Sequence, residues 1–277
     1  DNSCSVREDA IETVIYLLQV FYSNIENWEF KKFDTFGSLV GLVIPRCFDP
    51  SVVVQKTAYQ CLRLICLISN KLQAISSQND GALQIIDTII NEPNRYDMSQ
   101  KNMLNLSNYF AQKFKLESMS AWPLLKQLID GMTEPFLSNS INSCLILKYL
   151  VEILQNELKA EIPSIIDYLL LRMSLITFQD TKITLSQIIN ALAFHHLNIF
   201  SKHLLSYPLH RFNDTNKLWQ ILAQDLALCT ILIQKFLELF TEEDIVTHHP
   251  RKSQTKIAGS KVLAATVALR EIFLSHS

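Results

Sequence analysis

The stretch of sequence that decides the fold reads Ile44-Pro45-Arg46-Cys47-Phe48-Asp49-Pro50. It is typical of a corner between two helices, because Pro50 cannot continue a helix that ends near Phe48. Asp49 or Ser51 can cap the next helix by accepting a hydrogen bond from one of its first N–H groups. The sequence therefore predicts a helical hairpin centred on this corner.

The helix that follows the corner is amphipathic, with apolar residues recurring at helical spacing along one side. The apolar side carries Val54, Ala58, Cys61, Leu62, Ile65 and Ile68. The other side carries Gln55, Lys56, Tyr59, Gln60 and Arg63. The small Ala58 in the apolar stripe lets a second helix approach closely. This helix is therefore expected to pack against other helices along its apolar side and to leave its polar side exposed.

A matching stripe opens the chain, and it consists of Val6, Ala10, Val14, Leu17, Leu18 and Phe21. Ala10 and Ala58 stand 48 residues apart. A period in the forties indicates repeats that are built from pairs of helices.

The rest of the chain keeps helical spacing, and almost nothing alternates with period two. We expect further helices over residues 36–48, 82–91, 97–114, 119–132, 139–155, 163–176, 181–194, 198–206, 216–240 (long or broken) and 261–274. Ser138 or Asn139 is the expected cap of the 139–155 helix, and residues 241–260 are expected to form a polar inter-helix loop. Because each pair leaves one face uncovered, pairs must stack. We predict an all-α fold, an α-α superhelix of about five to six helical pairs over residues 1–277.

Composition argues against a nucleotide enzyme. Only five glycines occur in 277 residues, whereas average proteins contain about 7% glycine. Neither G-x-G-x-x-G nor G-x-x-x-x-G-K-[ST] is present, although phosphate-binding loops rely on glycine. The net charge of −2 creates no overall attraction for nucleic acid or an anionic membrane. The apolar run at residues 166–171 is too short to span a bilayer. We expect no catalysis, no cofactor and no small-molecule substrate.

Cysteines and histidines give no sign of a metal site. The six cysteines form no C-x-x-C pair, and most fall on apolar helix faces. They are expected to be small buried residues in a reducing, intracellular compartment, either cytoplasmic or nuclear. His195 and His196 are adjacent and would point about 100° apart on a helix, so a structural or surface role is favoured over zinc binding.

The densest basic run covers residues 249–256, with Lys261 beyond it. It contains no interleaved aromatic residue, and single-strand platforms use such residues for stacking. A solvated loop is therefore favoured over a nucleic-acid site.

One region of the chain indicates which family of helical-repeat proteins the sequence resembles. It contains Phe200–Leu205, Ser206-Tyr207-Pro208-Leu209, Asp214, Leu218-Trp219, Leu222-Ala223 and Leu226–Leu239. This region resembles the closing repeats of the maestro HEAT-like repeat family, in which a paired-leucine helix, a Pro-Leu corner and a tryptophan turn occur in that order. Val6-Arg7 and Asp49-Pro50 also fit the family. Gln55 is a departure, because HEAT repeats usually carry arginine there and use it in an aspartate–arginine ladder.

The resemblance implies a HEAT-like solenoid that serves as a non-enzymatic scaffold for protein–protein interaction, with a partner that the sequence does not identify. The alternatives are a helical regulatory domain of a larger enzyme and a nucleic-acid-binding solenoid, the latter resting on the basic run alone. Because helical patterns reach both ends of the chain, we expect a fragment of a longer solenoid. Its terminal helices, residues 6–22 and 261–274, should then expose apolar stripes.

In HEAT-like arrays the second helix of each pair usually lines the concave face. The presented sides should carry Lys56, Tyr59 and Arg63 on one such helix, and Lys148, Glu152 and Gln155 on another. Tyrosine and arginine are enriched at binding hot spots, and arginine can pair bidentately with a carboxylate. These residues are the predicted protein-binding site; the alternative is that they are ordinary solvated residues.

Overall fold

The structure is a computed structural model, and it describes residues 2–27, 33–73, 81–91, 99–116, 119–207, 212–246 and 265–274. Helices and short turns make up this described part, in which no strand occurs, so the all-α prediction is confirmed. The chain divides into two compact units. The first contains residues 1–154 and 172–184, and the second contains residues 155–171 and 185–277.

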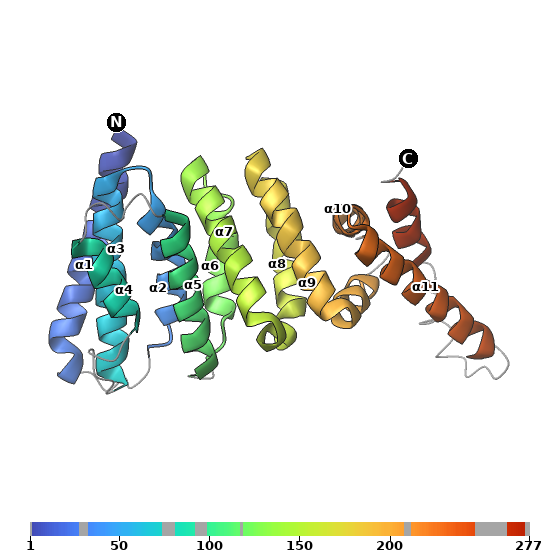
Figure 1. The fold of residues 1–277 in the computed structure, drawn as a ribbon, viewed down its shortest axis with the longest axis horizontal. Helices are drawn as coiled ribbons and strands as arrows, with labels where there is room; N and C mark the ends of the chain where they lie inside the picture. Colours follow the sequence, from blue (N-terminus) through green and yellow to red (C-terminus); the bar gives the residue numbers. More distant parts are fainter. Residues whose placement is uncertain are drawn as a thin grey trace. The chain divides into compact units, whose positions relative to one another are not determined.

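The first unit is a stack of helices in two layers (Figure 1). Its elements are α1 (Asn2–Asn24), η1 (Ile25–Asn27), α2 (Phe36–Val43), η2 (Ile44–Phe48), α3 (Val52–Leu72), α4 (Gly81–Asn91), α5 (Ser99–Leu116), α6 (Trp122–Gly131), α7 (Leu137–Leu154) and η6 (Met173–Leu175). The predicted corner joins η2 to α3, and Ser51 is the N-cap residue. Its hydroxyl makes no cap hydrogen bond, and the Asp49 carboxylate accepts the Ser51 N–H at 2.9 Å.

Helices α1 and α3 run parallel, in register with the 48-residue period. Near their starts, Sγ of Cys4 lies 3.1 Å from Oγ of Ser51. Near their ends, Nζ of Lys71 lies 3.1 Å from Oε1 of Glu26. Both pairs join residues that stand close to one period apart, so α1 sits on α3 as one repeat sits on the next.

The stacking between α2 and α7 is irregular. Helix α6 packs directly on α2, whereas α4 contacts α3 and α5 contacts α7 (Figure 1). The α2–α6 approach is close enough to require glycine, because a Cβ at Gly41 would lie 2.7 Å from Cβ of Gln127. The α4–α5 pair therefore adds two helices to the layer of α3 and α7 and none to the layer of α2 and α6. Phe36 of α2 joins the layers by ring contact with Phe110 and Phe114 of α5.

Two expected helix boundaries were wrong. Residues 181–194 and 198–206 belong to one element, α9 (Gln179–Leu205), in which His196 alone leaves helical geometry (φ −131°, ψ 31°). Neither glycine nor proline breaks this stretch, so a single residue takes up the kink. Ser138 and Asn139 are not caps, because α7 already begins at Leu137.

The second unit contains η5 (Gln155–Ala160), most of α8 (Ile162–Arg172) and most of α9, followed by α10 (Phe212–Ala223), α11 (Leu226–Val246) and helical residues 265–274. The predicted long or broken helix is broken, with a bend of 118° between α10 and α11. Asp225 explains the break, because its carboxylate accepts the N–H groups of Ala227 and Leu228 and so caps α11. Trp219 of α10 packs edge-on against Phe236 of α11.

The polar loop expected over residues 241–260 begins later than predicted, because α11 continues to Val246. Two glutamates at 242 and 243 are polar but are good helix formers, so polarity alone did not mark a helix end. The remaining loop residues, the basic run and Lys261 lie outside the described residues.

Candidate interaction surface

The first predicted binding group lies on α3, and the structure corrects one of its members. Lys56 is exposed and Arg63 is half-buried, but Tyr59 is only 1% exposed. The Tyr59 ring packs edge-on against Phe48, with ring centroids 6.3 Å apart. Helix α3 is covered by α1, α2, η2 and α4, so its buried side is wider than a single apolar stripe suggests. Tyr59 is therefore a core residue and is not on the presented side.

The exposed polar side of α3 continues onto α4. Lys56, Gln60 and Arg63 follow the i, i+4, i+7 spacing that places residues on one helix face. Nε of Arg63 lies 2.6 Å from Oδ1 of Asp87 on α4, and the two side chains are 43% and 42% exposed. We call these four residues, Lys56, Gln60, Arg63 and Asp87, the α3–α4 surface.

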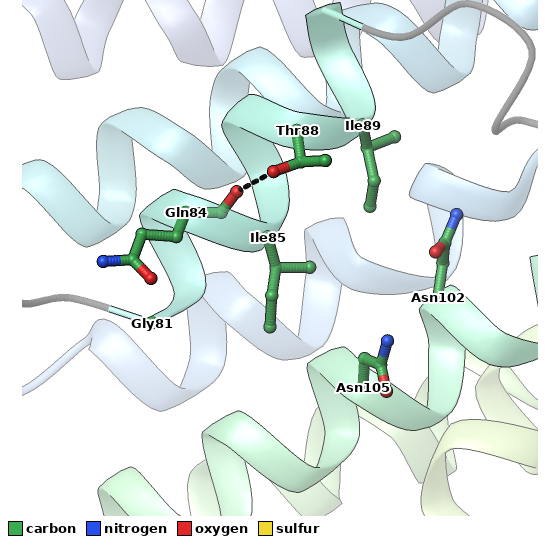
Figure 2. Close-up of a pocket in the computed structure, with 7 residues that line it drawn as sticks. All are labelled: Gly81, Gln84, Ile85, Thr88, Ile89, Asn102 and Asn105. Atoms are coloured by element: carbon green, nitrogen blue, oxygen red, sulfur yellow. Dashed lines mark hydrogen bonds between the residues drawn. The ribbon is translucent and has the colours of Figure 1, made fainter.

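A hollow of about 370 Å³ lies on the other side of α4, where it faces α5 (Figure 2). Its lining consists of Gly81, Gln84, Ile85, Thr88, Ile89, Asn102 and Asn105. The Thr88 hydroxyl donates to the Gln84 carbonyl at 2.6 Å. These seven residues carry no charge and offer amide groups and aliphatic surface, which suits a neutral polar group of a partner.

Two members of the second predicted group lie on α7, where Lys148 is half-buried and Glu152 is exposed; the third, Gln155, is exposed and begins η5. Helices α4 and α5 separate α3 from α7 within their layer. The two predicted groups therefore do not form one continuous patch of neighbouring helices.

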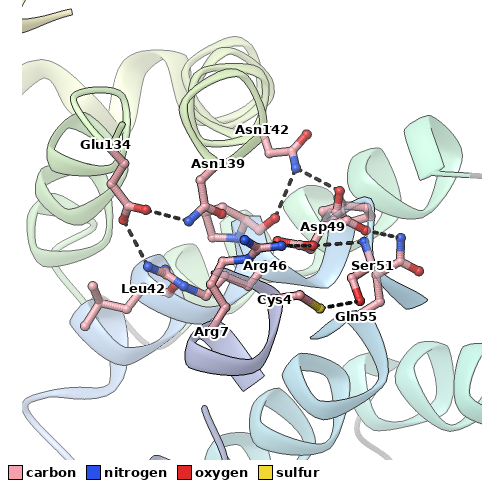
Figure 3. A network of polar contacts seen from close by, with 12 residues as sticks. Cys4, Arg7, Leu42, Arg46, Asp49, Ser51, Gln55, Glu134, Asn139 and Asn142 are labelled. Carbon is pink, nitrogen blue, oxygen red and sulfur yellow. Dashed lines mark hydrogen bonds and ion pairs between the residues drawn. The ribbon is translucent and has the colours of Figure 1, made fainter. Parts of the chain in front are cut away.

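A network of buried polar contacts at the corner was missed in the sequence (Figure 3). Nε and Nη2 of Arg7 lie 3.0 and 3.1 Å from the two carboxylate oxygens of Asp49, which is 1% exposed. The Arg7 guanidinium also covers the Phe136 ring at 5.2 Å. Gln55 cannot supply a cation, but its side-chain amide donates to the Asp49 carbonyl at 2.6 Å. An aspartate–arginine pairing is therefore present at this corner, with Arg7 in place of the arginine that Gln55 does not supply.

The same network extends to α6 and α7. Nη2 of Arg46 lies 3.0 Å from Oε1 of Glu134. The Asn142 side-chain amide donates to the Phe48 carbonyl at 2.9 Å and to the Pro45 carbonyl at 3.2 Å. These bonds satisfy carbonyl groups of the corner and join it to the next hairpin. We define the corner network as Arg7, Arg46, Asp49, Gln55, Glu134 and Asn142, and it connects α1, the corner and α7.

The cysteines behave as predicted from their positions. Cys47, Cys61, Cys66, Cys144 and Cys229 are buried, and Cys4 is partly exposed. Burial raises the pKa of the Cys61 and Cys144 thiols to about 12. A thiol with so high a pKa is a poor nucleophile near neutral pH, because the thiolate is the reactive form.

The histidines of α9 lie in separate environments. His195 is exposed, whereas His196 is buried with Nε2 2.9 Å from the Gln155 carbonyl oxygen. Burial lowers the pKa of His196. Nε2 of His203 lies 2.7 Å from Oδ1 of Asp167. Within the described ranges, no group of three or more histidine, cysteine or acidic residues could hold a metal ion.

One described helix, α3, is long and apolar enough to cross a membrane by length and composition. The α10–α11 pair meets the same test only if it counts as a single span despite its bend. More than half of the α3 segment, 56%, is buried inside the structure. Packing within the helical stack therefore accounts for its composition.

Comparison with known proteins supports the same fold. Residues 5–233 match the sequence model of the family described as Maestro, HEAT repeats. The chain belongs to the Maestro HEAT-repeat family. This confirms the resemblance seen in the sequence and the HEAT-like repeat fold.

A curated relative of this HEAT-repeat chain is Maestro heat-like repeat-containing protein family member 1 of Dictyostelium discoideum. The two are 25% identical over 283 residues, which cover 97% of this chain and 17% of the relative. The chain thus spans about a sixth of the relative's length. No solved structure matches the chain.

Proposed function

We propose that this chain is a non-enzymatic scaffold that binds another protein through the α3–α4 surface. Membership of a HEAT-repeat family supports a scaffold role. The observation that carries the proposal is the half-exposed Arg63–Asp87 pair. Arg63 shares a face of α3 with exposed Lys56, and Asp87 lies on α4, which borders an uncharged hollow.

The pair suits recognition because each side chain already holds the other in place. Ordering a long, flexible side chain on binding costs about 0.5–1.5 kcal/mol, and part of that cost is already met when a partner has fixed the side chain. The Arg63 guanidinium keeps donors that can reach a second carboxylate, since arginine offers five N–H groups. A partner with an acidic residue for Arg63 and Lys56, and a neutral polar residue for the hollow, would complement this surface.

The test uses a charge-reversing pair that leaves Arg63–Asp87 intact. Lys56→Glu with Gln60→Glu changes two exposed residues one helical turn apart. The matched control is Asn198→Glu with Lys202→Glu on α9, which has the same spacing, the same change in charge and exposed positions. We avoid Arg63→Glu, because a glutamate there would repel Asp87 and confuse stability with binding.

Partners are first captured with the unmodified chain and identified by mass spectrometry, and the affinity of the purified partner is then measured by calorimetry. The Lys56→Glu/Gln60→Glu variant should bind at least about tenfold more weakly, which corresponds to about 1.4 kcal/mol. The α9 control should bind within about twofold of the unmodified chain, and both variants should keep their thermal midpoints. Equal affinities for the two variants would place the interface elsewhere.

A further inference from the structure

Helix α1 exposes an aliphatic stripe along its outer face. Val6, Leu17 and Val20 are 66%, 61% and 47% exposed, and Ala10 lies between them on the same face and is also exposed. A second face, about 100° further round the helix, is buried, with Ile11, Leu18 and Ile25 in the core; this is the side that α1 turns towards α3. Helix α1 is therefore apolar on two sides, and one of them is uncovered.

The equivalent positions of α3 are completely buried. One period of 48 residues places Val6 on Val54, Ala10 on Ala58, Leu17 on Ile65 and Val20 on Ile68. All four α3 residues are 0% exposed. The two helices run parallel in this register, and α1 is the helix that packs on α3. The same stripe is thus covered in α3 and uncovered in α1.

We propose that the outer face of α1, formed by Val6, Ala10, Leu17 and Val20, is a docking surface for one further HEAT-type helix. This helix would run parallel to α1 and come from an adjoining repeat of a longer array. It should carry an aliphatic stripe towards α1, as α1 does towards α3. It should also carry an arginine near its start, because Asp1 occupies the position of Asp49 one period earlier in the sequence.

Two observations favour an adjoining repeat over other occupants. Stacking by one period already exists inside the chain, where α1 meets α3 and Arg7 reaches Asp49 across the repeat boundary. The curated relative is about six times longer than the matched region, so the family includes chains with much more sequence to supply such a helix. The proposal does not depend on the α3–α4 surface.

The test extends the complete chain by its own repeat. A second copy of residues 1–48 is placed before Asp1, so that Phe48 precedes Asp1 as it precedes Asp49 in the natural sequence. The added copy of α1 can then stack on the original α1 as that helix stacks on α3. Amide hydrogen exchange across the original α1 should slow by at least about tenfold, and the thermal midpoint should rise.

Two substitutions in the original α1 make the test specific. Leu17→Glu places a charge in the stripe and should remove the added protection. Gln19→Glu adds the same charge at another exposed position of α1 and should leave the protection in place. Neither change should unfold the unextended chain, because both residues are exposed there.

The proposal would be overturned if amide exchange in the original α1 did not slow in the extended chain, or if the slowing survived Leu17→Glu. So would sedimentation that shows the unextended chain forming a dimer that Leu17→Glu abolishes, because the occupant would then be a second copy. If the extended chain fails to fold, a synthetic peptide of residues 2–24 is titrated into the unextended chain and followed by methyl NMR. Shifts centred on Val6, Leu17 and Val20 and absent in Leu17→Glu are expected, and unchanged spectra would count against the docking surface.

Discussion

The two units both pair an acidic residue with a basic residue on another helix, but they do so at very different depths. In the first unit, Asp49 is 1% exposed and meets Arg7 across a repeat boundary. In the second unit, the Asp167 side chain is 56% exposed where it meets His203. A buried charge that loses its partner is strongly destabilising, whereas an exposed pair contributes little. The comparison predicts that losing one partner of the Arg7–Asp49 pair costs far more stability than losing one partner of the Asp167–His203 pair.

Removing the buried cation should have the largest effect. Arg7→Met leaves the Asp49 carboxylate buried and without its cation. The Ser51 N–H still donates a hydrogen bond to this carboxylate. The free energy of unfolding of the first unit should fall by about 3–5 kcal/mol, because an uncompensated charge remains in the interior. Urea denaturation, with hydrogen exchange to follow each unit separately, measures the loss.

The double variant Arg7→Met/Asp49→Asn is the control for this prediction. Removing both charges should recover much of the stability, since no lone charge is then buried. A loss below about 1 kcal/mol in Arg7→Met would mean that the first unit is not held together at this corner.

His196 should produce a smaller effect that depends on pH. Burial lowers its pKa in the folded state, so the unfolded state binds more protons as the pH falls through the ordinary histidine pKa of about 6.5. The second unit should therefore lose stability below about pH 6.5 and keep it above. His196→Asn removes the titrating ring and should flatten this dependence.

Stability of the second unit should be measured by denaturation at several values between about pH 8 and about pH 5.5, on either side of the histidine pKa. His195→Asn is the matched control, because His195 is the exposed neighbour. It should keep the pH dependence of the unmodified chain. The same pH dependence in His196→Asn and in the unmodified chain would assign the effect to other groups.

The smallest change is expected from Asp167→Asn. The carboxylate is more than half exposed, so its pairing with His203 should contribute less than about 1 kcal/mol to the free energy of unfolding. Tyr207 also contacts Asp167 and can donate to the amide oxygen that replaces the carboxylate. Thermal and urea denaturation of Asp167→Asn and Arg7→Met side by side would test the contrast between the two ion pairs. Similar losses of unfolding free energy in the two variants would contradict it.

Much of the candidate surface could be predicted from helical spacing. Lys56 and Glu152 were placed on exposed positions correctly. Tyr59 was misplaced because spacing identifies one stripe, whereas helix α3 is covered on several sides. The Arg7–Asp49 pair was missed, although a signal existed, since Arg7 stands one period before Gln55.

Helical spacing and proline geometry act over a few residues, so the helices, the corner at Pro50 and the 48-residue period could be predicted before the fold was known. The packing of α6 on α2, with α4 and α5 in the other layer, could not be predicted in this way. Nor could the burial of the stripe shared by α1 and α3, which is exposed in α1 and covered in α3. Burial depends on which helices meet, and residues far apart in the chain set those meetings.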